Sequence, residues 1–247
     1  MNAAPEDEQR LLELQSLDST LDRLAHRRRT LPELAELERI ETRLAETHDE
    51  IVAGETDDSD VGREQRKLEG DVEMVRERAA RDQKRLDSGQ VGSPKELENL
   101  QSEIESLGRR QSDLEDQVLE LMERREGVQS RLDALRTEQD KLLAERAATE
   151  QSRDANFAEI DTESATAAEQ RRAIAATLPG DLLALYEKVR ADKGGVGAAM
   201  LHRGRCEGCH LQLDAVQLRD ITAAPPDTVL RCDECRRILV RTAESGL

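Results

Sequence analysis

Apolar residues alternate at intervals of three and four through residues 94–149 and form one continuous heptad series. The series consists of Leu97, Leu100, Ile104, Leu107, Leu114, Val118, Leu121, Val128, Leu132, Leu135 and Leu142. A strict seven-residue repeat keeps one helical stripe facing a partner helix, whereas a helix on a globular core drifts at 3.6 residues per turn. The pattern predicts a coiled coil. Gln111, Arg125 and Gln139 interrupt the seam at every second a position, and we interpret them as residues that set the register.

A second seam precedes the first. It contains Leu37, Ile40, Leu44, Ile51, Val61, Leu68, Val72, Val75 and Leu86. The pattern weakens over residues 54–62, where two glycines and three aspartates predict either a bent helix or a short loop. Thr30 and Glu33 have the spacing of a capping box around Pro32, which predicts a kink near 30–33.

The segment between the two seams, 88–94, predicts a chain reversal. It contains two glycines, and Ser93 can cap a helix whose first residue is Pro94. Arms of similar length lie on either side, which favours an intramolecular antiparallel hairpin. A parallel dimer is the competing arrangement, but it leaves the matched arms unexplained.

Composition argues against a globular enzyme. The chain has 247 residues with one Tyr, one Phe and no Trp, so little aromatic volume is present to fill a core. The net charge is −17, and all of it lies within residues 1–200. No nucleophile arrangement or phosphate loop is evident, and the glycines of 194–197 fit a linker. We therefore expect that the protein is not an enzyme. With no secretory signal and no apolar run of membrane-spanning length, we expect it to be soluble and cytoplasmic.

All four cysteines lie near the end of the chain, as Cys206, Cys209, Cys232 and Cys235. Two CxxC turns supply four thiolates for one tetrahedral ion, and zinc is the ion that this donor set suits best. Four thiolates leave no open coordination position, so we expect one structural Zn²⁺ that supplies most of the folding free energy of the segment. Iron and a redox dithiol pair are the alternatives.

The surroundings of the cysteines fit a small β ribbon. Strands are expected at 197–201, 227–231 and 238–241, with a helix at 215–222 capped by Asp214. His202 and His210 flank the first CxxC turn, and we expect them to lie on the surface or beside the ligands without binding the ion, because four cysteines suffice.

The fold class is therefore mainly α: a long antiparallel coiled-coil helical hairpin with a small C-terminal β zinc ribbon. We predict a hairpin over 1–177, a short helix and linker over 178–196, and a zinc ribbon over 197–247. The short helix would run from Leu182 to Arg190, capped by Asp181, with Tyr186 on its face.

The chain resembles a family of bacterial proteins that join a coiled-coil hairpin to a four-cysteine zinc ribbon. The matching segments are Pro94–Leu97, Leu182–Glu187, Cys206–His210 and Arg231–Val240. The chain departs from the family pattern at Asp233, where Pro is common, and at Arg236, where Gly is common. The resemblance implies a binding role, since related proteins look like adaptors or chaperones in flagellar and secretion systems, and some are linked to RNA or transcription factors.

Two functions follow as expectations. The first is an adaptor, monomeric or weakly dimeric and without membrane contact, that binds an unidentified protein partner through the hairpin and the ribbon. The second is nucleic-acid binding through ribbon arginines, which are Arg203, Arg205, Arg231, Arg236 and Arg237, with Arg219 and Arg241 nearby. The acidic hairpin, the neutral ribbon and the lack of aromatic side chains there argue against the second.

Overall fold

A computed structural model describes residues 1–247, which form two compact units. One unit combines Met1–Ala35 with Gln151–Leu247, and the other is Glu36–Glu150. The helices α2 (Pro32–Asp87) and α3 (Pro94–Ala175) contribute residues to both units. The domain boundaries that the sequence suggests, at residues 177 and 196, stay predictions.

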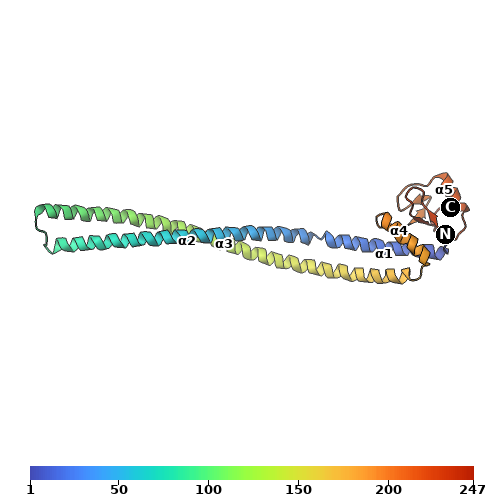
Figure 1. Cartoon of the computed structure of the whole chain (residues 1–247), viewed down its shortest axis with the longest axis horizontal. Coiled ribbons are helices and arrows are strands. Elements are labelled where there is room, and N and C mark those ends of the chain that lie inside the picture. Colours follow the sequence, from blue (N-terminus) through green and yellow to red (C-terminus); the bar gives the residue numbers. More distant parts are fainter. The chain divides into compact units, whose positions relative to one another are not determined.

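The unit of residues 36–150, here called the hairpin unit, is an antiparallel pair formed by parts of α2 and α3 (Figure 1). The helices are joined through residues 88–93. Ser93 Oγ accepts a hydrogen bond from the Glu96 N–H at 3.3 Å, and the Glu96 carboxylate accepts one from the Gly92 N–H at 3.0 Å. The first bond caps the first turn of α3, and the second attaches the preceding loop to that turn. The predicted helical hairpin is confirmed.

A narrow apolar seam joins the two helices of the hairpin unit. Its buried members include Ile40, Ile51, Val61 and Val72 on α2 and Leu100, Leu114, Leu132 and Leu142 on α3. Ion pairs cross between the helices beside this seam, among them Glu50–Arg131 at 3.0 Å and Arg76–Glu115 at 2.6 Å. Each exposed pair contributes little stability, but together they favour this register over a shifted one.

Residues 54–62 are helical, which settles the choice between helix and loop. The two glycines allow close contact with α3. A Cβ atom on Gly54 would lie 2.8 Å from Leu132 Cδ2, and one on Gly62 would lie 3.4 Å from the Arg125 guanidinium carbon. Arg125 donates from Nε to Asp58 Oδ1 at 3.0 Å. Packing against α3 therefore compensates the low helix propensity of the glycines.

The other unit, here called the head unit, begins with α1 (Pro5–Arg29). The helix break falls at Thr30 and Leu31. Past the break, Glu33 Oε1 accepts hydrogen bonds from Ser152 Oγ at 2.9 Å and Asn156 Nδ2 at 2.7 Å, both on α3. Side chains of α3 thus fix the direction of the chain after the break.

The head unit contains a four-stranded sheet. Its strands are β1 (Ala198–His202), β2 (Arg205–Cys206), β3 (Leu230–Arg231) and β4 (Ile238–Val240), in the order β2-β1-β4-β3. β1 and β4 are parallel, and the other neighbours are antiparallel. The first residues of the chain lie along the β3 side, because the Ala3 N–H donates to the Asp227 carbonyl at 2.7 Å and the Val229 N–H to the Met1 carbonyl at 3.1 Å.

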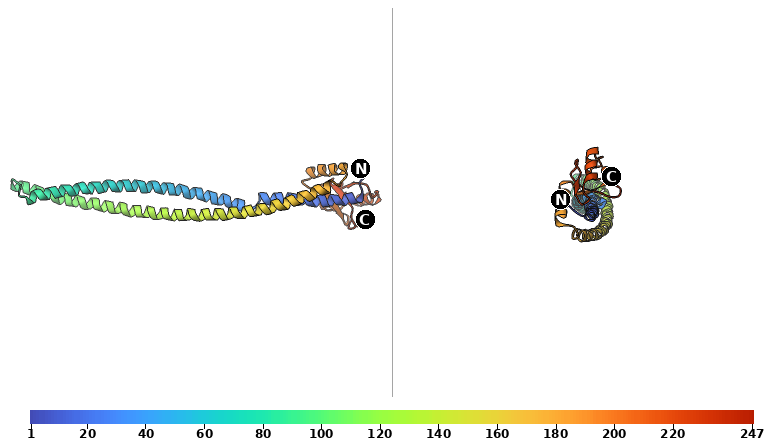
Figure 2. Two further views of the ribbon diagram at one scale, coloured as in Figure 1. Left: turned by 90° about the horizontal axis from the view of Figure 1, so that it is seen from below. Right: turned by 90° about the vertical axis from the view of Figure 1, so that its right-hand side faces the viewer.

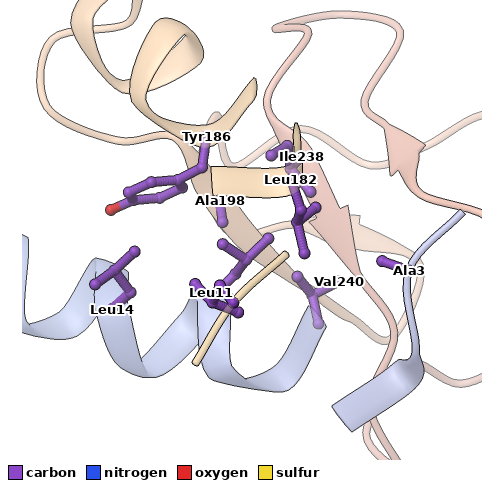
Figure 3. Close-up of a cluster of buried hydrophobic side chains, with 9 residues drawn as sticks. Ala3, Leu11, Leu14, Leu182, Tyr186, Ala198, Ile238 and Val240 are labelled. Atoms are coloured by element: carbon purple, nitrogen blue, oxygen red, sulfur yellow. The ribbon is translucent and has the colours of Figure 1, made fainter. Parts of the chain in front are cut away.

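Alternation along the strands gives the sheet two buried faces. Ala198, Ile238 and Val240 pack against α1 and against α4 (Gly180–Asp192). Figure 3 shows Leu11 and Leu14 of α1 on one side of this cluster and Leu182 and Tyr186 of α4 on the other.

The opposite face contacts α5 and two of the cysteines. Ala199, Leu201 and Leu239 pack there with Ile221 of α5 (Ala215–Ala223). Asp214 caps α5 as predicted, with Oδ1 accepting from the Gln217 N–H at 2.7 Å.

The capping of α4 differs from the prediction. Pro179 is the N-cap of the helix, and Asp181 lies in its first turn, where its carboxylate accepts from the Leu182 N–H at 2.9 Å. Tyr186 is fully buried, because α1 covers the face of α4 on which it lies.

None of the helices combines the length with the apolar composition that crossing a membrane requires.

Candidate metal centre

The four cysteines of the two CxxC turns form one cluster. Their sulfur atoms are all within 4.8 Å of one another, and the Cys206–Cys235 and Cys209–Cys232 sulfurs are each 3.9 Å apart. A tetrahedron with zinc–sulfur bonds of about 2.3 Å has edges of about 3.8 Å. The spacing therefore fits one zinc ion with four thiolate ligands.

The two CxxC turns have the same backbone geometry. The His210 N–H donates to the Cys206 carbonyl at 2.8 Å, and the Arg236 N–H donates to the Cys232 carbonyl at 2.8 Å. His210 and Arg236 both have positive φ, 61° and 63°. Arg236 thus adopts the left-handed conformation that favours glycine, at a cost of about 1 kcal/mol.

Gly208 occupies a position at which no larger residue fits. A Cβ atom there would lie 2.9 Å from the Ala199 Cβ and 2.7 Å from the Arg237 Cδ. The first turn can therefore approach the sheet closely only because residue 208 is glycine.

The protonation chemistry of the cluster calls for a cation. Burial, together with the nearby sulfurs of Cys232 and Cys235, raises the pKa of Cys206 to about 12. Burial also raises the pKa of Cys232. Burial works in the same direction on Cys235, but hydrogen bonds from Arg237 outweigh it and bring the pKa of Cys235 to about 7. Four thiolates this close repel one another, and a bound Zn²⁺ supplies the charge that keeps them deprotonated.

The two histidines beside the first CxxC turn pair with carboxylates. His202 Nδ1 lies 3.3 Å from the Glu244 carboxylate, and His210 Nδ1 lies 3.6 Å from that of Glu207. Neither histidine belongs to the group of side chains that could hold a metal ion.

Most ribbon arginines proposed as phosphate contacts already bind groups of the protein. Arg231 donates to the Arg236 carbonyl at 2.8 Å, and Arg237 donates to the carbonyls of Lys193 at 2.8 Å and Val196 at 3.0 Å. Arg205 and Arg236 lie 3.8 and 3.7 Å from the carboxylates of Glu207 and Asp233.

Two further arginines near the ribbon differ in how far they are engaged. Arg241 donates to four carbonyls of the loop before β3, those of Ala224, Pro225, Pro226 and Thr228. Arg203 is exposed, and its side chain forms no hydrogen bond or ion pair.

A buried polar network that the sequence did not predict attaches α1 to the ribbon. Gln15 Oε1 accepts from the Gly197 N–H at 2.7 Å, and Gln15 Nε2 donates to the Gly195 carbonyl at 2.9 Å. The Tyr186 hydroxyl donates to Asp18 Oδ2 at 2.6 Å. Burial and this hydrogen bond raise the pKa of Tyr186 well above its ordinary value. The glycine segment predicted as a linker is therefore fixed to the first helix.

The fold and the cysteine cluster define a zinc-binding protein in which a helical hairpin is combined with a C4-type zinc ribbon. The model of the CT398-like coiled coil hairpin domain matches residues 14–194, and that of the C4-type zinc ribbon domain matches residues 205–239. The chain belongs to the family of CT398-like coiled-coil hairpin proteins.

Similar proteins come from mycobacteria and from Chlamydia trachomatis. The Mycobacterium tuberculosis protein Rv2229c is 38% identical over 98% of both chains, and Mycobacterium leprae ML1638 is 31% identical over 90% of this chain and 94% of its own. A solved Mycobacterium smegmatis structure has a TM-score of 0.85 at 35% identity, covering 98% of this chain and all of that one. The structure of CT398 from Chlamydia trachomatis has a TM-score of 0.71 at 20% identity, covering 96% and 98%, and shares the fold.

Proposed function

We propose that the protein is a non-catalytic adaptor that binds protein partners through its helical hairpin and its zinc-organised head. The zinc site supports a structural role, because four thiolates occupy all positions of a tetrahedral ion and leave none for water or substrate. The metal then holds the ribbon together and performs no reaction.

The observation that carries the proposal is the amount of exposed surface. The chain exposes 15331 Å², whereas a globular protein of 27.7 kDa exposes about 11,000 Å². In the hairpin unit only the narrow seam is buried, so most side chains of both helices are accessible. Such a surface suits contact with other macromolecules better than it suits a reaction that needs an enclosed site.

A protein partner fits the charge better than a nucleic acid does. Residues 36–150 hold 32 acidic and 19 basic side chains, and this excess would repel phosphate. In the ribbon, Arg231 and Arg237 donate to backbone carbonyls, which leaves fewer cations for phosphate contacts.

The test is affinity capture by the full-length, zinc-loaded protein from lysate of its native cells at physiological salt, with retained proteins and nucleic acids both identified. We expect a reproducible protein partner that survives nuclease treatment. Retention of nucleic acid alone, or of proteins that nuclease releases, would reject the adaptor and favour the nucleic-acid function.

A further inference from the structure

The hairpin unit contains an apolar groove with an acidic rim. Its volume is about 370 Å³, and its apolar lining comes from Val72 of α2 and from Val118 and Leu119 of α3. Glu69, Glu73 and Glu115 line it as well, together with one basic side chain, Arg76. The groove lies within one unit and is far in sequence from the cysteines, so the zinc site does not explain it.

Leu119 and Met122 add apolar surface that the coiled coil does not require. The seam of α3 uses Leu114, Val118 and Leu121 in this region, so Leu119 and Met122 lie outside it. Leu119 is 56% exposed and Met122 is 41% exposed. Residues three apart share a helix face, so the two side chains form one apolar patch at the groove. Positions outside the seam of a two-stranded coil are ordinarily polar.

Acidic side chains outnumber the basic one by three to one in the lining of the groove. Glu73 has no ion pair or hydrogen bond, and Glu69 accepts only from the uncharged amide of Gln65, at 2.8 Å. Glu115 is the exception, because it pairs with Arg76 at 2.6 Å. On α3, Asp116 and Glu123 flank the patch without a basic partner.

The negative charge of the rim indicates which kind of partner the groove would bind. A second copy of this chain would bring another hairpin with the same excess of acidic side chains, and the two would repel each other. A partner with apolar side chains alone would leave the acidic rim uncompensated. A basic helix satisfies both features, since its apolar side chains fill the groove while its cations meet the rim.

We infer that the groove at Val72, Val118 and Leu119 docks a basic amphipathic helix of a partner protein. The inference rests on the proposed adaptor function and specifies the partner's chemistry and its place on the hairpin. Apolar residues of the partner, spaced three and four apart, contact Leu119 and Met122. Its Lys or Arg side chains pair with Glu69 and Glu73.

The direct test measures binding of a synthetic 18-residue Leu/Lys peptide with helical amphipathic spacing to the full-length, zinc-loaded protein by fluorescence anisotropy. The test variant is Leu119→Gln/Met122→Gln. Its matched control is Leu143→Gln, since Leu143 is also 41% exposed on α3 but does not line this groove. All three side chains lie outside the seam, so thermal unfolding should be unchanged.

We expect the double variant to lose about tenfold in affinity and the control to stay within about twofold of the unsubstituted protein. A peptide of the same composition with Leu spread around the helix should bind the three proteins alike and weakly. Equal binding of the amphipathic peptide to both variants would overturn the inference, as would a concentration-dependent dimer that only the double variant loses.

Capture from lysate separates this inference from the proposed function. A protein partner retained by the unsubstituted protein and the control, but lost from Leu119→Gln/Met122→Gln, supports both. A partner retained equally by the double variant overturns the groove assignment and leaves the adaptor function intact. Absence of any protein partner, with the Leu/Lys peptide still binding at the groove, counts against the adaptor function alone.

Discussion

The hairpin unit and the zinc ribbon are stabilised in opposite ways. In the hairpin unit, stability is distributed along a seam in which each residue meets a few neighbours, and exposed ion pairs add small increments. In the ribbon, Leu201 and Leu239 are completely buried on the sheet face that packs with the cysteine cluster, and Ile238 and Val240 are completely buried on the opposite face. We therefore expect substitutions to have small, local effects in the hairpin unit and large, cooperative effects in the ribbon.

The two units also differ in charge. The hairpin unit has 13 more acidic than basic side chains, whereas the rest of the chain has 22 acidic against 18 basic, an excess of 4. Most of the excess negative charge of the chain therefore lies on the hairpin unit. Figure 2 shows α2 and α3 side by side over residues 36–150, with no other element covering either helix.

The largest effect should come from disrupting the metal cluster. Chelation of zinc, or Cys232→Ser, should unfold the ribbon, because metal binding supplies on the order of 10 kcal/mol to the folding of such small domains. The amide NMR signals of residues 198–240 should lose their dispersion, while the helical circular dichroism should fall only slightly. Preserved ribbon signals in metal-free, reduced protein would contradict the prediction.

The next largest effect should come from the polar network in which Asp18 of α1 contacts Tyr186 of α4 and Arg171 of α3. Asp18 is 1% exposed and accepts from Tyr186 and Arg171. Asp18→Ala should cost about 2–4 kcal/mol in the free energy of urea unfolding, because it leaves buried donors without an acceptor.

Asp22→Ala is the matched control for this network. Asp22 lies one turn further along α1 and pairs with Arg190 at 2.9 Å, but its side chain is about half exposed. Its loss should cost less than about 1 kcal/mol. Similar costs for the two variants would mean that burial does not set the strength of this network.

The same contrast explains which features the sequence could predict. Heptad periodicity and the Ser93-Pro94 start are local signals, so they predicted the helices, the reversal and the seam. The CxxC spacing predicted the metal cluster for the same reason. The region of 54–62 stayed open because its glycines disfavour a helix locally, whereas Leu132 and Arg125 of the facing helix stabilise it.

The attachment of α1 to the head could not be predicted in this way. Leu11 and Leu14 look like ordinary positions of a helical stripe, and the Gln15 partners outside α1 lie 171 or more residues away. The one available signal was Tyr186. In a chain with so few aromatic residues, the single tyrosine contributes more to stability when its large apolar area is buried. Nothing in the sequence indicated which helix covers it.

A pH-dependent effect on stability should arise at Glu8, which is a residue of α1 in the head unit. Glu8 is buried, and its Oε1 atom has no hydrogen-bond partner. Burial raises the pKa of Glu8 to about 7, although Arg241 acts in the opposite direction. Because the folded protein binds this proton more tightly than the unfolded chain, the carboxyl lowers stability increasingly as pH rises from about 4.5 to about 7, and by a constant amount above that.

Glu8→Gln should therefore stabilise the protein at pH 8 by about 1–2 kcal/mol and by progressively less toward pH 5.5. Urea unfolding of both proteins in saturating zinc across this range measures the difference, and shared contributions from other groups cancel. A difference that stays constant with pH would show that Glu8 does not titrate as stated.

The smallest effect should come from two glycines of the hairpin unit. A Cβ atom at Gly70 meets nothing within 4 Å, whereas one at Gly54 lies 2.8 Å from Leu132. Gly70→Ala should stabilise the protein by about 0.5–1 kcal/mol through helix propensity. Gly54→Ala has the same propensity gain but must displace a buried leucine, so its unfolding free energy should fall about 1–2 kcal/mol below that of Gly70→Ala. Thermal unfolding followed at 222 nm compares the two variants. Equal stabilisation by the two substitutions would contradict the prediction. It would show that Leu132 moves aside at Gly54 without a measurable cost in stability.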